Sequence, residues 1–222
     1  ASPTMTEGLG PLDSSHVLLV GTSDWLEALS DALAERTEAT VRRAATEAEA
    51  LETFRDSGVD CVVTEYRLDD GTGIDLTQAV RAEARSVPVV LGATAGNEAV
   101  ASAAIGAGVS DYVALTTPTE QLTELLERTA RAVRSARRTA TERQRARQFD
   151  AVFDDARTAT WVLDPTGALI RANQTARDMI ETPVESIVGD QFWRLPWWSH
   201  GDSARPDVEQ LVETAREGQF GN

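Results

Sequence analysis

Asp60-Cys-Val-Val-Thr-Glu65-Tyr-Arg-Leu-Asp-Asp-Gly-Thr-Gly73-Ile-Asp-Leu76 is the stretch of sequence that decides the fold. Its apolar and β-branched start predicts a buried strand that ends at the acidic residue Glu65. Two glycines then mark a loop, and the residues after Gly73 indicate the start of a helix. A nearly continuous apolar strand of this kind is typical of parallel sheets that are covered by helices on both faces.

The same alternation of strand and helix extends on both sides of this stretch. Strands are predicted over Val17–Val20, Ala39–Arg43, Val59–Thr64, Val87–Leu91 and Val109–Leu115. Helices are predicted over Asp24–Glu35, from a capping box at Thr46–Glu49, near 74–84 and 97–107, and after Pro118. This pattern predicts an α/β fold with a doubly wound, parallel, five-stranded sheet. Such a sheet places its functional site at the carboxyl ends of the strands, where Glu65 lies.

Charge divides the chain into parts. Its net charge is -15, but residues 119–148 alone carry +4, between flanks of -12 over residues 1–118 and -7 over residues 149–222. The basic segment contains no glycine or proline, which predicts one long helix whose second half leaves the sheet. We therefore expect a disordered tail over residues 1–14, a domain over residues 15–118, its last helix and a linker over residues 119–148, and a second domain over residues 149–222.

Composition bounds the function. All basic residues are arginine, and such an acidic surface makes nucleic acid an improbable partner despite seven arginines between residues 131 and 147. No apolar run approaches the ~18 residues of a membrane span, and no signal peptide opens the chain, so we expect a cytoplasmic protein without membrane contact. The single cysteine, Cys61, lies in a predicted strand and is expected to be a buried structural thiol. The lysine-free, acidic composition resembles that of proteins from salt-loving archaea, and a GC-rich genome is the alternative explanation.

The pattern changes after Phe149. Residues 149–156 predict a short amphipathic helix, and two strands, Thr158–Leu163 and Ala168–Ala172, flank a tight turn at Asp164–Gly167. Short helices are expected around 174–180 and 183–188, followed by an aromatic cluster up to Trp198 and a helix over Asp207–Arg216.

Residues 16–135 resemble the receiver domains of two-component response regulators, which have a flavodoxin-like form of this fold. The resemblance rests on the Tyr66-Arg-Leu-x-x-Gly-x-Gly loop and on the Ala107-Gly-x-x-Asp-Tyr112 segment. In that family an acidic pair and a phosphoacceptor Asp hold Mg²⁺, and a hydroxyl and a lysine contact the phosphoryl oxygens. The resemblance places the phosphoacceptor on Glu65, the acidic pair on Gly21 and Thr22, the hydroxyl on Ala93 and the lysine on Leu115.

None of these positions keeps the residue of the family. The resemblance therefore implies a pseudo-receiver that cannot be phosphorylated, with no catalytic residue, no metal and no cofactor in this domain. Glu65 either mimics a phosphorylated Asp or reflects drift in a site that no longer acts. Tyr112 matches the switch aromatic of the family, and a plain packing role is the alternative.

Residues 149–222 resemble the first part of a PAS sensor domain of α+β class. The resemblance rests on the order of elements, on Ala172-Asn-x-x-Ala176 and on the Phe192-Trp…Trp-Trp-Ser-His wording, which is similar to that in halophilic-archaeal regulators. A complete PAS domain has five antiparallel strands and only two are predicted here, so the domain is expected to be truncated. Pocket residues are expected at Trp161, Asn173, Phe192 and Trp193, with an aromatic core as the alternative and an unknown ligand.

These features predict a signal-transduction regulator in which a pseudo-receiver is coupled through a helix to a PAS sensory or dimerisation module. Its expected partners are proteins of a two-component pathway and a second copy of the chain, which is expected to pair through Leu122, Leu125 and Leu126. The alternatives are the sensory front of a histidine kinase, which would be an enzyme, or the front of a helix-turn-helix transcription regulator.

Overall fold

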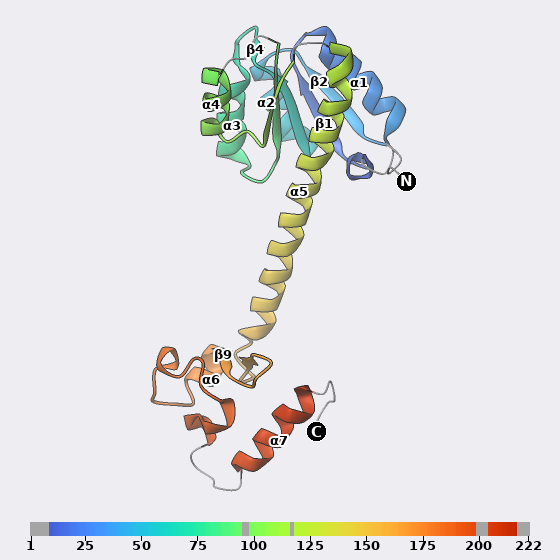
Figure 1. Cartoon of the computed structure of the whole chain (residues 1–222). Coiled ribbons are helices and arrows are strands. Elements are labelled where there is room, and N and C mark those ends of the chain that lie inside the picture. Colours follow the sequence, from blue (N-terminus) through green and yellow to red (C-terminus); the bar gives the residue numbers. More distant parts are fainter. Residues whose placement is uncertain (1–8, 95–97, 116–117, 199–203, 217–222) are drawn as a thin grey trace. The chain divides into compact units, whose positions relative to one another are not determined.

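The computed structural model describes residues 9–94, 98–115, 118–198 and 204–216 of the chain (Figure 1). Its contacts divide the chain into two units, residues 1–142 and residues 143–222. The first eight residues of the predicted disordered tail lie outside the described part. Within the described ranges, no helix is long and apolar enough to cross a membrane.

Five parallel strands form the sheet of the first unit. They are β1 (His16–Val20), β2 (Thr40–Ala44), β3 (Cys61–Glu65), β6 (Val89–Ala93) and β7 (Asp111–Ala114), in the order β2-β1-β3-β6-β7. Two short antiparallel strands, β4 (Arg67–Leu68) and β5 (Gly71–Thr72), pair within the loop after β3. The predicted doubly wound parallel sheet is confirmed, and its order reverses between β1 and β3, beside the carboxyl end of β3.

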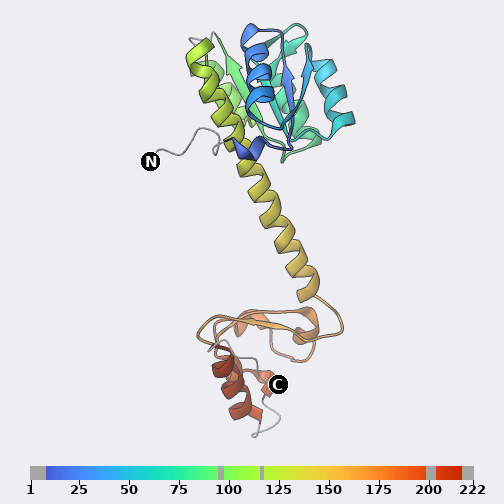
Figure 2. The same cartoon turned by 90° about the vertical axis from the view of Figure 1, so that its right-hand side faces the viewer.

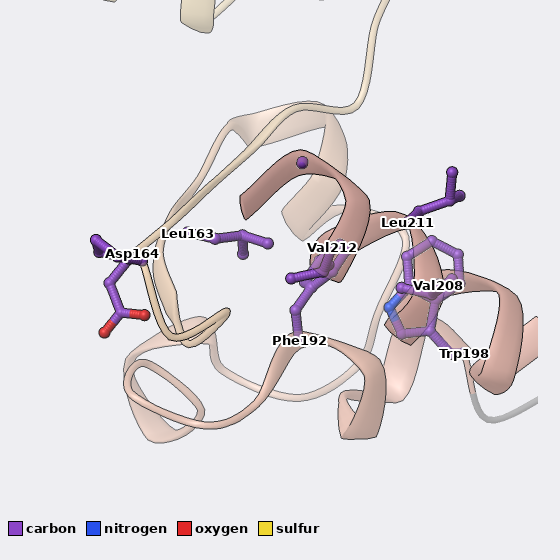
Figure 3. A pocket seen from close by; sticks show the side chains of 9 residues that line it. Leu163, Asp164, Phe192, Trp198, Val208, Leu211 and Val212 are labelled. Atoms are coloured by element: carbon purple, nitrogen blue, oxygen red, sulfur yellow. The ribbon is translucent and has the colours of Figure 1, made fainter. Parts of the chain in front are cut away.

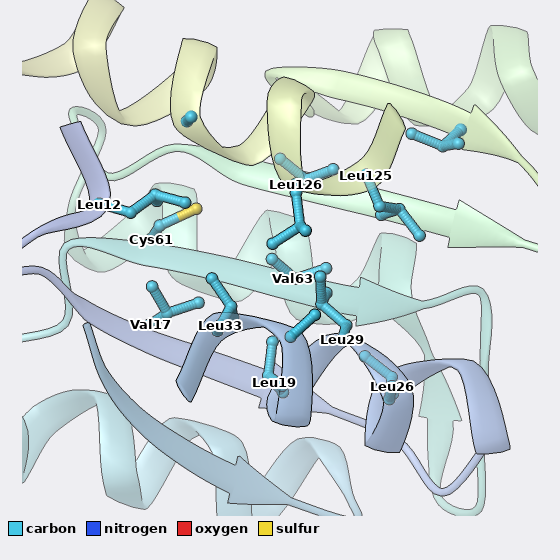
Figure 4. Packing of buried hydrophobic residues seen from close by; sticks show 14 of the residues in the cluster. Leu12, Val17, Leu19, Leu26, Leu29, Leu33, Cys61, Val63, Leu125 and Leu126 are labelled. Carbon is cyan, nitrogen blue, oxygen red and sulfur yellow. The ribbon is translucent and has the colours of Figure 1, made fainter. Parts of the chain in front are cut away.

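Helices cover both faces of this sheet (Figures 1 and 2). One face carries α1 (Asp24–Arg36) and the first half of α5 (Pro118–Phe153), and the other carries α2 (Glu47–Ser57), α3 (Gly73–Glu83) and α4 (Glu98–Ala107). Figure 4 shows leucines of α1 and α5 meeting side chains of β1 and β3, among them Leu29, Leu33, Leu125 and Leu126. Each such side chain contributes about 1.5–3 kcal/mol on burial, so this packing fixes the sheet on which the site is built.

Side-chain caps set two of the helix starts. Before α3, the Thr72 hydroxyl accepts the Asp75 N–H at 3.2 Å and the Asp75 carboxylate accepts the Thr72 N–H at 3.2 Å, which is a complete capping box. Before α2, Thr46 accepts the Glu49 N–H at 3.2 Å, but the Glu49 carboxylate accepts the N–H of Ala45, at 2.8 Å. The capping box predicted at Thr46 is therefore only half formed.

The prediction of disorder is wrong for residues 9–14. A 3-10 turn, η1 (Gly10–Leu12), precedes β1, and the side chains of Leu9 and Leu12 are buried in the core cluster beneath α1 and α5. Burial of the two leucines offsets part of the entropy lost on ordering this segment, and the Asp13 carboxylate also accepts the Glu38 N–H at 3.1 Å.

Helix α5 is longer than expected. It continues to Phe153, so the separate short helix predicted from Phe149 is in fact its last turns. The predicted pairing of two copies through Leu122, Leu125 and Leu126 is also wrong as to its residues: Leu125 and Leu126 are buried in the core of their own unit, and Leu122 packs against that core. Their spacing of three and four residues marks the face that meets the sheet. A homodimer stays a prediction without a defined interface.

The second unit holds the two predicted strands as an antiparallel hairpin. It contains β8 (Trp161–Leu163), β9 (Leu169–Ala172), α6 (Gln174–Arg177), α7 (Ala204–Arg216) and three 3-10 turns, η2 (Val184–Ser186), η3 (Phe192–Arg194) and η4 (Pro196–Trp198). Its core combines the hairpin with the aromatic cluster and includes Leu169, Ala172, Phe192 and Leu195.

Candidate functional site

Glu65 ends β3 at the carboxyl edge of the sheet, and its side chain is buried, with 9% exposed. The carboxylate reaches the loop after β1, where Oε1 accepts the N–H of Thr22 at 2.8 Å and Oε2 accepts a hydrogen bond from the Ser23 hydroxyl. Ser23 is the N-cap residue of α1, yet its hydroxyl makes no capping bond. The Glu65 carboxylate therefore joins the end of β3 to the loop after β1, through the Thr22 N–H and the hydroxyl of Ser23, the N-cap residue of α1.

Gly21 makes room for this carboxylate. Its φ is +130°, a conformation that L side chains rarely adopt, and a Cβ atom at this position would overlap the carboxyl group of Glu65. The two residues that the receiver resemblance assigns to the acidic pair thus act differently here: Gly21 leaves a space, and Thr22 supplies a backbone donor. An acidic side chain at residue 21 would need the same space as Glu65.

Apolar side chains occupy the neighbouring positions. Trp25 of α1 lies against Gly92 of β6, because a Cβ at residue 92 would fall 2.8 Å from Trp25 Cη2 and 3.1 Å from Leu115 Cδ1. Trp25, Ala93 and Leu115 are all buried. The positions assigned to a hydroxyl and a lysine are therefore filled by side chains that can neither donate a hydrogen bond nor carry charge.

A small polar cavity of ≈ 280 Å³ remains above Glu65. It is lined by Thr22, Ser23, Trp25, Glu65, Tyr66, Arg67, Gly92, Ala93 and Thr94. Among the described residues, no group of three or more His, Cys, Asp and Glu side chains is placed to hold a metal ion. The family implies Mg²⁺ at this edge, but a single carboxylate that is already hydrogen-bonded does not provide the oxygen ligands that Mg²⁺ prefers.

Other acids near this edge have structural roles. The Asp70 carboxylate accepts the N–H groups of Glu47 and Ala48, at 2.7 and 3.1 Å, and so caps the start of α2. These hydrogen bonds lower the pKa of Asp70. Desolvation, with the nearby charges of Asp75 and Asp70, raises the pKa of Glu47. This acidic loop is used to hold α2 and α3 against each other.

Tyr112 lies on β7, opposite Leu91 of β6. It is partly buried, and its hydroxyl is buried without a hydrogen-bond partner in the part of the chain that the structure describes. The neighbouring Asp111 forms an ion pair with Arg128 of α5 at 2.6 Å, which ties this strand to the long helix. A half-buried ring with an unpaired hydroxyl fits either of the two roles predicted for Tyr112.

The predicted pocket residues of the second unit have different roles. Asn173 donates to the carbonyls of Phe153 and Thr158, at 2.8 and 2.7 Å, and accepts the N–H groups of Thr160 and Ala176, at 3.0 and 2.9 Å. It is fully occupied in joining the end of α5 to the hairpin and in capping α6.

The three aromatic residues of that prediction lie in or beside the aromatic cluster. Trp161 packs on Phe192 with ring centroids 5.4 Å apart, and Trp193 packs against Gly167. Phe192 alone of the four predicted residues lines the apolar cavity of this unit (Figure 3). Helix α7, which the sequence predicted only as a helix over Asp207–Arg216, contributes four of the other eight lining residues.

Sequence reasoning missed Ser23 and Trp25. Ser23 reads as an ordinary helix cap, and Trp25 as one apolar position of an amphipathic helix. Only Gly92, an unusual residue inside a buried strand, signals that a large side chain approaches the sheet there.

Comparison with known proteins gives consistent results. The family described as the response regulator receiver domain matches residues 17–127. The sensor histidine kinase TmoS of Ectopseudomonas mendocina is 30% identical over 69 residues, which are 31% of this chain and 7% of that protein. The chain thus matches only 7% of the length of this relative.

Two solved structures show the same fold. The signal receiver domain of a putative Luxo repressor protein from Vibrio parahaemolyticus has a TM-score of 0.51 at 17% identity, over 58% of this chain and 96% of that one. NtrX from Brucella abortus has a TM-score of 0.52 at 20% identity, over 64% of this chain and 34% of that one.

Proposed function

The chain belongs to the response regulator receiver family, and from this premise we propose that its first unit is a pseudo-receiver, a signalling domain that does not take up phosphate. Receiver domains work within two-component pathways, so its partners are proteins of such a pathway. The observation that carries the proposal is the seating of the Glu65 carboxylate over Gly21, on the Thr22 N–H and the Ser23 hydroxyl.

Phosphoryl transfer to a carboxylate requires charge neutralisation, because two anions must meet. Here the position of the acceptor is a glutamate whose two oxygens are both engaged, and the positions of the metal-binding acids hold a glycine and a threonine. Leu115 supplies no cation, and Trp25 closes the apolar side of the site. In the proposed pseudo-receiver, the hydrogen-bonded Glu65 carboxylate takes the place of a metal ion and a phosphoryl group.

The second unit is proposed to be a PAS-type sensory module joined to the pseudo-receiver through α5. A hairpin with a tight turn at Asp164–Gly167, an asparagine that caps the helix after β9, and an aromatic cluster against the hairpin support this assignment. Within this assignment, β8 and β9 would be two of the five antiparallel strands of a PAS domain.

A second candidate function is the sensory front of a histidine kinase. The similarity to a protein named as a sensor histidine kinase favours it, although the match covers 69 residues. Under this alternative the pseudo-receiver and the PAS-type unit would regulate a kinase, and the residues of this chain would still perform no catalysis themselves.

Incubation of the chain with acetyl phosphate and Mg²⁺, followed by intact-mass measurement under mildly acidic conditions, tests the pseudo-receiver. We expect no phosphoryl adduct on this chain, whereas a receiver domain that keeps the full acidic site serves as the positive control and is labelled. A stable adduct on Glu65, or on any Asp of residues 17–127, contradicts the proposal.

A further inference from the structure

An apolar cavity of ≈ 500 Å³ lies in the second unit, between the hairpin and α7 (Figure 3). Helix α7 contributes Val208, Leu211, Val212 and Ala215, which recur at the spacing of one helical face. Leu163, Asp164, Pro165, Phe192 and Trp198 complete the lining. Its volume lies within the range of about 300–1,000 Å³ that is usual for small-molecule sites, and its walls are almost entirely apolar.

Two buried indole N–H groups in this cluster have no hydrogen-bond partner among the residues that the structure describes. The N–H of Trp197 donates to the Ala176 carbonyl at 2.7 Å, but Nε1 of Trp198 and Nε1 of Trp161 are buried without a hydrogen-bond partner in the described residues. Trp198 lines the cavity, and Figure 3 shows its ring beside Val208 and Leu211. An unpaired buried donor costs free energy, and an acceptor brought by a ligand removes that cost.

The absence of a cation among the lining residues restricts the kind of ligand. Asp164 is among the lining residues, but its carboxylate points away from the cavity (Figure 3) and accepts hydrogen bonds from the Thr166 N–H at 2.8 Å and the Ala168 N–H at 2.9 Å. These bonds and the Thr166 hydroxyl lower its pKa, so Asp164 is ionised at neutral pH. No Arg or His is among the lining residues. An anionic ligand would therefore leave water for apolar walls with no compensating cation among the lining residues.

We propose that the second unit binds a neutral, flat, largely apolar molecule with one hydrogen-bond acceptor, which enters between the hairpin and α7 and accepts the N–H of Trp198. Aromatic walls at Phe192 and Trp198 favour a planar ring system. The inference rests on the proposed sensory role of this unit and names the class of ligand that it would sense.

Two probes of matched shape test the proposal: 2-acetylnaphthalene, which has a ketone acceptor, and 2-ethylnaphthalene, which has none. Binding to the whole 222-residue chain is measured by calorimetry, and 5-fluorotryptophan labelling with ¹⁹F NMR locates it, with Trp25 of the first unit as an internal reference. We expect both probes to shift the Trp198 signal and leave Trp25 unchanged. The ketone should bind roughly three- to tenfold more tightly, as expected for one added hydrogen bond.

Three variants separate the contributions. Trp198→Phe should abolish the preference for the ketone while the ethyl probe still binds, and Leu211→Arg should weaken both probes at least about tenfold by placing a charge in the cavity. Ile170→Arg is the matched control, because Ile170 is 46% exposed and Leu211 is 45% exposed, but only Leu211 lines the cavity. This control should not change the affinity for either probe.

The proposal is overturned by absence of saturable binding of both probes, by equal affinities for them in the unchanged chain, or by equal effects of Leu211→Arg and Ile170→Arg. Each of these results leaves the pseudo-receiver standing, since that is judged by the acetyl phosphate experiment. A phosphoryl adduct in that experiment would in turn leave the cavity proposal standing.

Discussion

Removal of the Glu65 carboxylate is the most direct perturbation of the candidate site. Glu65→Ala leaves the Thr22 N–H and the Ser23 hydroxyl without their acceptor. A hydrogen bond to a charged group contributes about 1.5–3 kcal/mol, and water in the adjoining cavity can replace part of it. We therefore expect the free energy of unfolding of the first unit to fall by about 2–4 kcal/mol.

Gly21→Ala tests whether the Glu65 carboxyl group occupies the space next to Gly21. It introduces a Cβ where φ is +130° and where the carboxyl group of Glu65 lies, so it adds backbone strain and displaces the carboxylate. The strain alone costs roughly 1–2 kcal/mol and persists in any background. The steric part disappears when Glu65 is already alanine. The double variant should thus be less destabilised than the sum of the single variants, by about 1–2 kcal/mol.

Urea unfolding of the intact chain measures these values through the ¹⁹F signal of 5-fluorotryptophan at Trp25, the single tryptophan of residues 1–142. Glu83→Ala is the control, because its carboxylate pairs with a largely exposed Arg55 on the protein surface and should change stability little. If the effects of Gly21→Ala and Glu65→Ala add within about 0.5 kcal/mol, the carboxylate does not occupy the space over Gly21 and the explanation of the site is refuted.

Four further results are expected. Leu126→Arg should destabilise the first unit by more than about 4 kcal/mol and unfold it, because Leu126 is 1% exposed. The control Glu127→Arg, on the exposed side of α5, should leave the circular dichroism spectrum unchanged, and a folded Leu126→Arg chain would contradict the packing. Asn173→Ala should destabilise the second unit by roughly 3 kcal/mol or more in ¹⁹F-detected urea titration, since four hydrogen bonds are lost, and Gln174→Ala is the neighbouring control that should have little effect. Burial raises the pKa of Cys61 from its ordinary value of 9.0 to about 12. The stability that the neutral thiol contributes is therefore present below pH 9.0 and is lost as the pH rises toward 12. Alkylation by iodoacetamide at pH 8 should require unfolding, and rapid alkylation of the native chain would argue against burial. A net charge of -15 without lysine predicts a melting temperature that rises steeply from ~0.1 to ~3 M KCl as the Debye length falls from about 10 Å to about 3 Å or less, and a flat curve in differential scanning calorimetry would contradict a halophilic surface.

The first unit follows from its sequence because local and global preferences agree. Buried parallel strands such as Cys61–Glu65 and Val89–Ala93 read as continuous apolar runs, and loop signals separate each from the next helix. Errors arose where tertiary contacts overrode composition. Leu9 and Leu12 order a segment that looks like a tail, and the leucines of α5 that look like a pairing surface face their own sheet.

The candidate site was predictable only in part. The residues at positions 21, 22, 65, 93 and 115 can be read along the chain, and their departure from the family pattern is what suggests the proposed pseudo-receiver. The contacts of the Glu65 carboxylate and of Trp25 depend on distances between β1, β3 and β6, which no local pattern encodes. The capping and joining role of Asn173 is hidden from the sequence for the same reason. Its hydrogen-bond partners lie between Phe153 and Ala176, and only the folded chain brings them together.

Introducing the acids and the lysine of the family's site into this chain would require several changes at once, because the residues of the site pack against one another. An acid at residue 21 meets both the positive φ of Gly21 and the carboxylate of Glu65. A lysine at residue 115 would replace a side chain that packs at Gly92 beside Trp25, and would bring its ammonium group into that apolar contact. Shortening Trp25 to admit the lysine would empty the space that Gly92 provides for the tryptophan ring, at a cost of about 3–5 kcal/mol for loss of a buried tryptophan side chain. Single reversions should therefore lower stability without adding reactivity, and only a combined set can be expected to bind Mg²⁺.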